Sequence, residues 1–261
     1  MPEGTKRALT QKTASVPALD RGLAILEVLA NHHTGLTLSQ LVRQLRLPKS
    51  SVHSLVLTFE RAGYLTKIEP SGRYICGIKF IHIANLAFDN PMLRQSAKPI
   101  LVELMRSTGL TVHLATLWRD EVVLIDRVSP AGGPPVATWI GKRLDAHCTA
   151  AGKCLIAHLP DSGLQALIRE RGMLRHNDNT IRTLRKLEEE LAGVRRAGYA
   201  VDDEEEEIGI RCLGVCVRSP DGGVIAAISV SGNTDQISET NLPSLVVQLQ
   251  RAARGISGQS V

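Results

Sequence analysis

Apolar residues recur three and four positions apart through the first 60 residues, which is the spacing of helices with one buried face. Three such stripes follow one another and predict three short helices. Their apolar positions are Leu19, Leu23, Leu26 and Ala30, then Leu38, Leu41, Val42 and Leu45, then Val52, Leu55, Val56 and Phe59. The second helix opens on a capping box, Thr37 to Gln40, and the third begins after Pro48 and closes at Gly63.

Two short strand-like runs come next, residues 64–68 and 73–76, joined by the turn Glu69-Pro70-Ser71-Gly72. Three helices followed by a hairpin is the order of a winged helix-turn-helix, whose third helix enters the major groove of DNA. We therefore predict this domain over residues 18–77. The polar residues 1–17, which lack periodicity, are predicted to be a flexible arm.

Packing of the third helix leaves its other side free for recognition. The candidate DNA-binding residues are Lys49, Ser50, Ser51, His53 and Ser54 on this side, with Arg73 on the hairpin. Hydroxyl groups suit phosphate oxygens and Lys49 supplies positive charge, so we expect contacts to phosphates and base edges. The alternative is that the serines only cap the helix and that His53 is a solvated surface residue.

Charge divides the chain unevenly. Residues 1–79 hold 11 Lys and Arg against 5 Asp and Glu, a net +6, whereas residues 80–261 hold 20 against 21, a net −1. A small basic segment attached to a larger neutral one indicates that the basic part binds a polyanion, which the predicted winged helix-turn-helix makes double-stranded DNA. A basic surface without a partner would give the same count.

Residues 78–90 are predicted to form a linker helix that packs against a partner, and a new helix begins at Pro91 and runs to Ser107. Strand-like runs then alternate with helical ones. The expected strands are residues 111–118, 121–128, 199–201, 209–218 and 224–230, and the expected helices are residues 149–158, 161–171, 180–197 and 238–254. Antiparallel hairpins with helices on one side make residues 91–261 an α+β sensor-like domain. We interpret the acidic run 202–207 as a mostly solvated face with Asp202 at its inner edge.

Composition argues against a membrane-spanning, an exported or a disulfide-rich protein. No apolar run approaches the roughly 18 residues that span a bilayer, and the first residues lack an apolar export segment, so we expect a cytoplasmic protein with no membrane partner. Five cysteines without short paired spacings indicate reduced thiols rather than a disulfide framework.

Several stretches together resemble the IclR-type transcriptional regulators. They are LPKSSVHSLVLTFERAGYL (residues 47–65), GRYICG (72–77), GKRLDAHCTAAGKCLIAHLP (141–160), GYAVDDEEEEIGIRCLGVCV (198–217) and AAISVSG (226–232). They occur in the family's order and span nearly all of the chain beyond the arm. The resemblance implies a winged-helix DNA-binding domain, a linker helix and a GAF-like effector-binding domain, assembled as a homodimer or a dimer of dimers on an operator.

The resemblance also implies a small-molecule pocket in the C-terminal domain. Carried over position by position, its residues are Val136, Leu144, Ala150, Ala151, Asp202, Ile210, Cys212, Ser229 and Ser231. Ala150 and Ala151 are small and begin a helix, while Ser229 and Ser231, two apart on a strand, place both hydroxyls on one face. These groups suit the carboxylate of an organic or aromatic acid, held without a counter-charge against an apolar wall.

Two alternatives use the histidines and cysteines of the C-terminal half. An enzyme would draw on His147, Cys148, Cys154, Cys212 and Cys216, with Asp202 orienting the base. A metal- or redox-responsive regulator would use His113, His147, Cys148 and Cys212. The sequence lacks a nucleophile elbow, phosphate-binding and dinucleotide-binding loops, and the C-x-x-C and H-x-x-x-H spacings. We therefore predict a regulator that is not an enzyme, and we assign no cofactor and no metal ligand. The metal- or redox-responsive regulator stays the alternative to a sensor of organic acids.

Overall fold

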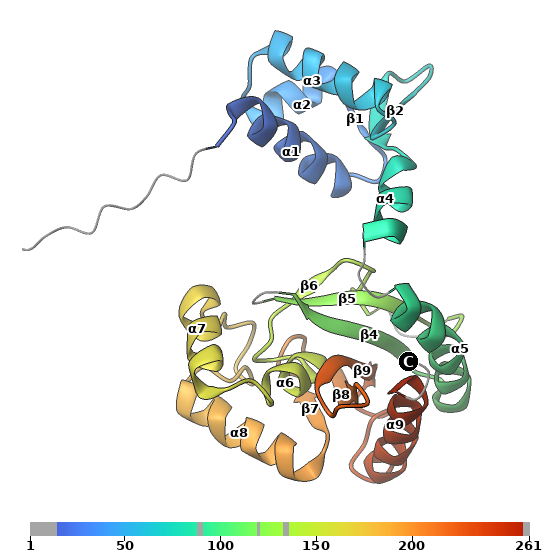
Figure 1. Ribbon diagram of the computed structural model, residues 1–261, viewed down its shortest axis with the longest axis vertical. Coiled ribbons are helices and arrows are strands. Elements are labelled where there is room, and N and C mark those ends of the chain that lie inside the picture. Colours follow the sequence, from blue (N-terminus) through green and yellow to red (C-terminus); the bar gives the residue numbers. More distant parts are fainter. Residues whose placement is uncertain (1–14, 88–90, 119–120, 133–135, 258–261) are drawn as a thin grey trace, which may run out of the picture. The chain divides into compact units, whose positions relative to one another are not determined.

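The computed structural model describes residues 15–87, 91–118, 121–132 and 136–257 (Figure 1). The chain divides into two compact units, Met1–Asp89 and Asn90–Val261. The predicted arm lies almost wholly outside the described residues, and the first helix begins at Pro17. Among the described residues, no helix is long and apolar enough to cross a membrane.

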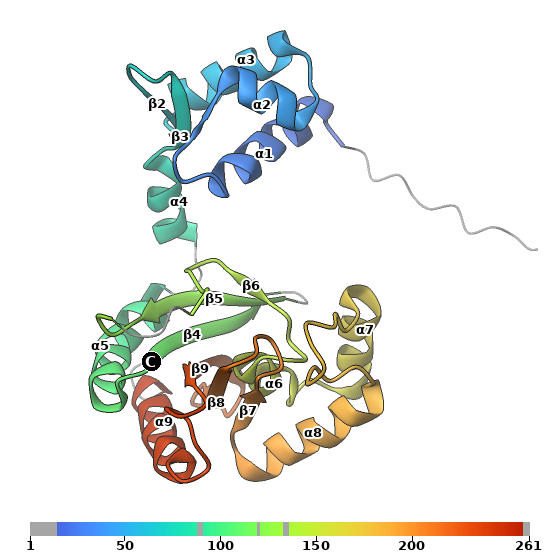
Figure 2. The ribbon, with the colours of Figure 1, turned by 180° about the vertical axis from the view of Figure 1, so that it is seen from behind.

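The described residues of the first unit form four helices and a small antiparallel sheet. Its elements are α1 (Pro17–Ala30), β1 (Leu36–Thr37), α2 (Leu38–Leu45), α3 (Lys49–Arg61), β2 (Leu65–Ile68), β3 (Arg73–Cys76) and α4 (Lys79–Ala87). The strands lie in the order β1-β3-β2, and the β2–β3 hairpin forms the wing (Figure 2). Strand β1 was not predicted, because two residues are too short to show a period.

The core of this unit confirms two of the three predicted helix faces. Leu41 of α2 and both Val52 and Val56 of α3 are fully buried. The predicted face of α1 is wrong, because Leu19 and Leu23 are 58% and 49% exposed.

Helix α1 instead buries Gly22, Ile25 and Leu29. A Cβ on Gly22 would lie only 3.0 Å from Cζ of Phe59 on α3. The missing side chain therefore lets the two helices approach closely, and this contact decides which side of α1 faces the core.

The turn between α2 and α3 follows from local chemistry. Thr37 caps α2 in a capping box, its Oγ1 accepting from the Gln40 amide at 3.3 Å while the Thr37 amide donates to Gln40 Oε1 at 2.8 Å. Arg46 ends α2 in the left-handed region at φ 54°, and Pro48 precedes the first residue of α3. A loop of three residues, 46–48, therefore joins the two helices of the helix-turn-helix.

The second unit is built on a six-stranded antiparallel sheet in the order β6-β5-β4-β9-β8-β7. Its strands are β4 (Thr111–Trp118), β5 (Glu121–Val128), β6 (Arg143–Leu144), β7 (Ala200–Asp203), β8 (Ile210–Arg218) and β9 (Val224–Asn233). Its helices are α5 (Pro91–Thr108), α6 (Ala150–Ile156), α7 (Asp161–Arg171), α8 (Leu184–Ala197) and α9 (Leu242–Ser257).

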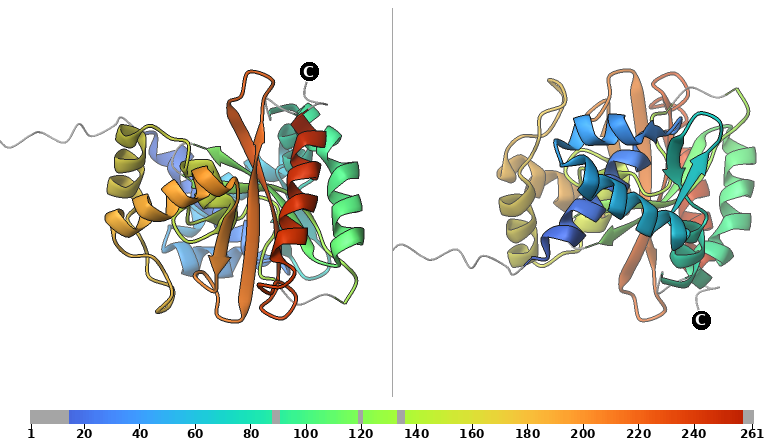
Figure 3. Two further views of the ribbon diagram at one scale, coloured as in Figure 1. Left: turned by 90° about the horizontal axis from the view of Figure 1, so that it is seen from below. Right: turned by 90° about the horizontal axis from the view of Figure 1, so that it is seen from above.

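Helices cover both faces of this sheet, so the expectation of helices on one side is wrong (Figures 1 and 3). Helices α5 and α9 pack on one face, against Leu114 and Ile228, and the layer of α6, α7 and α8 packs on the other, against Ala115 and Ala227. The central strands β4 and β9 are buried at successive positions, so each face needs its own cover.

Two helices begin later than predicted, and the residue before each of them forms a side-chain hydrogen bond there. Helix α8 starts at Leu184 rather than at residue 180, since the Thr183 side chain accepts the Lys186 amide at its start. Thr180 has another role, donating from Oγ1 to the Glu205 carbonyl at 2.8 Å. Helix α9 starts at Leu242 rather than at residue 238, and the Asn241 side chain accepts the upstream Ser238 amide at 3.0 Å in the turn before the helix.

Candidate functional site

The central strands place polar side chains on the sheet face that α6 covers. His113 on β4 lies opposite Ser229 on β9, and Cys212 on β8 lies opposite Ser231 on β9. Asp202 on β7 lies opposite Cys212. Directly opposed residues of antiparallel strands share a face and lie about 5 Å apart, so the five side chains converge.

All nine predicted effector residues line one cavity at this place, and we call it the sheet cavity. They are Val136, Leu144, Ala150, Ala151, Asp202, Ile210, Cys212, Ser229 and Ser231. Several further polar residues line it and were not predicted to do so, among them His113, Thr138, Lys142, Thr149, Glu206 and Glu207.

Among the cavity residues that were not predicted, His113 could have been predicted from the sequence, whereas Thr138 and Lys142 could not. His113 lies two positions from Ala115 on β4, so strict alternation along that strand would have placed it on the cavity face. Thr138 and Lys142 lie in a segment without regular structure, where no period indicates a side chain's direction.

A chain of polar contacts crosses the cavity. Cys212 Sγ and Ser231 Oγ lie 3.0 Å apart, Ser231 Oγ and His113 Nδ1 lie 3.5 Å apart, and His113 Nε2 hydrogen-bonds with Thr138 Oγ1 at 2.8 Å. Strands β8, β4 and β9 are thereby joined to the irregular segment 136–142.

Burial sets the protonation of these groups. Desolvation, helped by Arg127 and Lys142, lowers the pKa of His113 to about 3, so its ring is neutral at physiological pH. Desolvation also raises the pKa of Asp202 to about 7. It raises the pKa of the Cys212 thiol well above its ordinary value, so this cysteine is not an activated nucleophile.

Two cations lie at or near the cavity, which corrects the expectation of a site without counter-charge. Lys142 lines it and forms an ion pair with Glu206 at 3.3 Å. Arg127 contributes to the low pKa of His113, and its buried Nε has no hydrogen-bond partner among the described residues.

The acidic run 202–207 is partly buried, not mostly solvated as predicted. Asp202 and Glu205 are buried, and Glu205 pairs with Lys153, which is 1% exposed. Lys153 Nζ also contacts Glu190 at 3.1 Å and donates to the Val201 carbonyl at 2.8 Å. Burial alone would lower the pKa of Lys153, but Glu205 and Glu190 raise it above its ordinary value. The buried cation holds α6 to the acidic run.

The predicted DNA-binding side chains lie together on α3, apart from Arg73. Lys49, Ser50, His53 and Ser54 are exposed and Ser51 is half-buried in the first two turns of α3, which also hold the buried Val52. Arg73 is half-buried and donates from Nη1 to the Gly35 carbonyl at 2.9 Å. One guanidinium N–H is thus used to hold the loop before β1.

The proposed metal ligands are not gathered in one place. His113 and Cys212 line the sheet cavity, whereas His147 Nε2 hydrogen-bonds with the Leu174 carbonyl at 3.0 Å. Among the described residues, the ligand atoms of Asp145, Cys148 and His176 lie within 4.8 Å of one another, a group that shares only Cys148 with the predicted set. Burial, with Glu206 and Asp202, raises the pKa of the Cys148 thiol, which disfavours a thiolate ligand.

A basic winged helix-turn-helix together with an antiparallel-sheet domain that encloses a polar cavity defines the class of ligand-responsive transcriptional regulators. Residues 18–69 match the IclR helix-turn-helix domain, and residues 86–258 match the bacterial transcriptional regulator IclR C-terminal domain. The chain belongs to the IclR family of transcriptional regulators, which confirms the resemblance. It is a DNA-binding regulator with an effector-binding C-terminal domain, and it is not an enzyme.

Similar proteins cover nearly the whole chain. The HTH-type transcriptional regulator XynR of Escherichia coli (strain K12) is 34% identical over 242 residues, which is 93% of this chain and 96% of that protein. The crystal structure of the Thermotoga maritima IclR superposes with a TM-score of 0.80 at 29% identity, covering 93% of this chain and 98% of that one. An IclR homologue from Microbacterium hydrocarbonoxydans, complexed with 4-hydroxybenzoate, gives a TM-score of 0.83 at 26% identity, with coverage of 93% and 98%.

Proposed function

We propose that the protein binds a near-palindromic operator in double-stranded DNA as a homodimer or a dimer of dimers, and that a small organic or aromatic acid in the sheet cavity controls this binding. The observation that carries the proposal is the convergence of the nine implied effector residues on one cavity. A regulator of this kind acts in the cytoplasm, where the DNA lies.

The cavity offers groups that suit a carboxylate. Ser229 and Ser231 present hydroxyls from one face of β9, and Lys142 supplies a cation at the wall. His113 is neutral, so it interacts with an acid as a hydrogen-bonding partner rather than as a charge. Val136, Leu144 and Ile210 give the remaining wall its apolar character.

Binding requires the cavity to widen. Its volume is about 30 Å³, room for about two water molecules, whereas small-molecule sites run to several hundred Å³. The segment 136–142 is the wall without regular structure. Lys142 Nζ donates to the Ala137 carbonyl at 2.8 Å and Thr138 hydrogen-bonds with His113, so an entering acid replaces these contacts.

The relative from Microbacterium hydrocarbonoxydans supports the chemical class of the effector. That homologue was crystallised with 4-hydroxybenzoate, an aromatic acid. A panel of aromatic and aliphatic carboxylic acids that includes this compound is therefore the rational first screen. A ligand at 100 times its dissociation constant stabilises the fold by about 2.7 kcal/mol, which a thermal-shift assay detects.

The test is release of operator DNA as an acid from this screen is titrated. The Ser229→Ala/Ser231→Ala double variant loses two charge-assisted hydrogen bonds, each worth roughly 1.5 to 3 kcal/mol, so acid affinity is expected to fall at least a hundredfold. DNA binding without the acid should persist. Full response in the double variant would contradict the proposed site.

A metal-responsive regulator is the second candidate, favoured by the grouping of Asp145, Cys148 and His176. A chelator and a Cys148→Ser variant distinguish it from the organic-acid site, because each removes the response to a thiolate-bound metal. Cys212→Ser should change the response to an acid only modestly. If chelator or Cys148→Ser abolishes the response while the double-serine variant retains it, the metal candidate replaces the acid.

A further inference from the structure

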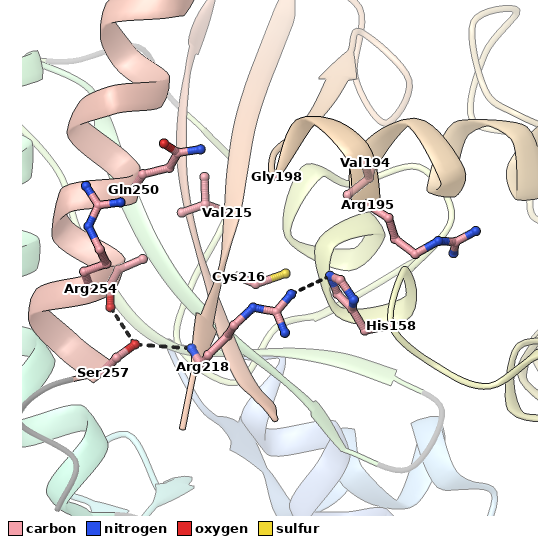
Figure 4. A pocket seen from close by; sticks show the side chains of 11 residues that line it. His158, Val194, Arg195, Gly198, Val215, Cys216, Arg218, Gln250, Arg254 and Ser257 are labelled. Atoms are coloured by element: carbon pink, nitrogen blue, oxygen red, sulfur yellow. Dashed lines mark hydrogen bonds between the residues drawn. The ribbon is translucent and has the colours of Figure 1, made fainter. Parts of the chain in front are cut away.

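A second and larger cavity lies in the C-terminal unit, and we call it the edge cavity (Figure 4). Its volume is about 310 Å³, and it shares no lining residue with the sheet cavity. Its polar lining includes Arg195, Arg218, Arg254, His158 and Gln250. The implied effector site does not account for this cavity.

The cavity exists because one strand is shorter than its neighbour. Strand β7 pairs with β8 from Arg211 to Gly214, so β8 has no partner strand on that side from Val215 to Arg218. Gly198, at φ 76°, ends α8 beside this gap, and the C-terminal end of α9 flanks it. Figure 4 shows Arg218 reaching from β8 toward His158, with Gln250 and Arg254 on α9.

The three arginines have no carboxylate partner in the part of the chain that the structure describes. Among the described residues, no carboxylate forms an ion pair with Arg195, Arg218 or Arg254. Arg218 Nη2 donates to His158 Nε2 at 3.0 Å, and Arg195 Nη1 donates to the Ala157 carbonyl at 2.8 Å. His158 therefore accepts this bond through an unprotonated nitrogen and adds no charge.

Helix dipoles explain part of this charge but not all of it. Arg195 and Arg254 lie in the last turns of α8 and α9, where cations complement the negative helix ends. The C-terminal ends of two helices each carry a charge of about −0.5, whereas the three guanidinium groups carry +3. A net charge of about +2 therefore remains around the cavity. Arg218 lies on a strand, where no helix end accounts for it.

The floor of the cavity is apolar. Val194, Val215 and Ala253 are buried and line it, and Cys216 lies beside them. Figure 4 shows the arginines on different sides of the cavity, with exposed guanidinium groups around an apolar floor, and a volume near 300 Å³ is that of a small-molecule site. From this floor and from three arginines that form no ion pair with a carboxylate among the described residues, we propose that the edge cavity is a second ligand site, for a small organic dianion such as a phosphate monoester or a dicarboxylate.

The test is isothermal titration of the full chain with phenyl phosphate and with phenylmalonate, which share an apolar ring and differ in the acidic group. The Arg218→Gln/Arg254→Gln variant should bind the better probe about tenfold more weakly, since it removes two of the three guanidinium charges at the cavity. The matched control, Arg196→Gln/Arg251→Gln, removes the same charge from α8 and α9 at exposed positions outside the cavity lining. It should change affinity less than twofold, and circular dichroism should show both variants folded.

The outcomes separate the proposal from its competitors. Tighter binding of phenyl phosphate assigns the site to phosphate monoesters, and tighter binding of phenylmalonate assigns it to dicarboxylates. An equal loss of probe affinity in the control variant would show that the probe is attracted by the positive charge of the whole surface, which would overturn the proposed site. If the Ser229→Ala/Ser231→Ala variant loses probe binding while the arginine variant keeps it, the probe binds in the sheet cavity and the proposal is overturned. The proposal is also overturned if neither probe binds at millimolar concentration.

Discussion

Asp202 shows how burial sets the chemistry of a single residue in the sheet cavity. Its side chain is 1% exposed, and desolvation raises its pKa from 3.8 to about 7. The Glu205 amide donates to its Oδ1 at 2.8 Å and Lys153 lies nearby, and both lower the pKa, whereas Glu205 and Glu206 raise it. The carboxyl is therefore partly protonated at neutral pH, although it lies beside a run of acidic residues.

This shift predicts a pH dependence of stability. Between about pH 4 and 7 the folded protein keeps a proton that the unfolded chain releases, so the free energy of unfolding falls as pH rises through that window. Asp202→Asn should flatten this fall and be more stable than wild type at pH 8, by up to about 4 kcal/mol. Urea unfolding at pH 5, 6, 7 and 8 measures it, with Asp235→Asn as an exposed control. Equal slopes in wild type and Asp202→Asn would contradict the assignment.

Lys49 is the single residue for which we predict a contact with a DNA phosphate. Its side chain is exposed at the first turn of α3, where it can neutralise a phosphate. Lys49→Ala should weaken binding to all DNA sequences and make the salt dependence of log affinity shallower by about 1 per protomer. Fluorescence anisotropy at several salt concentrations measures the slope. Lys186→Ala, an exposed lysine on α8, is the control, and an unchanged slope in Lys49→Ala would remove this residue from the interface.

At the scale of elements, the contact between α6 and β8 fixes the sheet cavity. A Cβ on Gly214 of β8 would lie 2.9 Å from the carbonyl carbon and oxygen of Ala150, the first residue of α6. Glycine at this position allows the helix start to lie against the strand. Ala150 and Ala151 line the cavity as a result, and β7 sets Asp202 beside them.

Gly214→Ala should therefore push α6 from the sheet. We expect the free energy of unfolding to fall by about 1 to 3 kcal/mol and binding of the organic acid to weaken. Gly193→Ala on α8 is the matched control, because a Cβ there meets nothing within 4 Å and alanine favours a helix by roughly 0.5 to 1 kcal/mol. Urea unfolding of the two variants should give changes of opposite sign, and a stable Gly214→Ala with full acid affinity would refute the close contact.

At the scale of the whole molecule, one winged helix contacts a single half-site, so recognition of an operator calls for two copies. Helix α4 offers apolar side chains for such pairing, with Ile78 just before it 80% exposed and Ile81 61% exposed. Contiguous exposed apolar residues at helical spacing indicate a surface that another chain covers.

Ile81→Glu should weaken self-association, because it places a charge on this surface. Analytical ultracentrifugation should show a shift toward monomer, with lower affinity for half-sites spaced about 10 bp apart and unchanged acid binding. Lys79→Glu, on the same helix but on another side, also adds negative charge and should leave assembly unchanged. A dimer of full operator affinity in Ile81→Glu would place the interface elsewhere.

The sequence by itself determined the elements whose signals are local. The faces of α2 and α3, the capping box at Thr37, and strands β4 and β5 follow from spacing over a few residues, because side-chain direction repeats regularly along a helix or strand. The candidate cavity residues came from the resemblance to a family rather than from spacing, and the structure brings all nine together.

Tertiary contacts decided what local spacing does not encode. The buried face of α1 depends on Gly22 meeting Phe59, and burial of the acidic run depends on Lys153 reaching Glu205. The lining of the sheet cavity by Lys142 and the open edge of β8 beside Arg218 depend on where separate segments end. In each case the energy comes from groups tens of residues apart in sequence, so only the packed chain determines whether a charge is buried, paired or left free to bind a ligand.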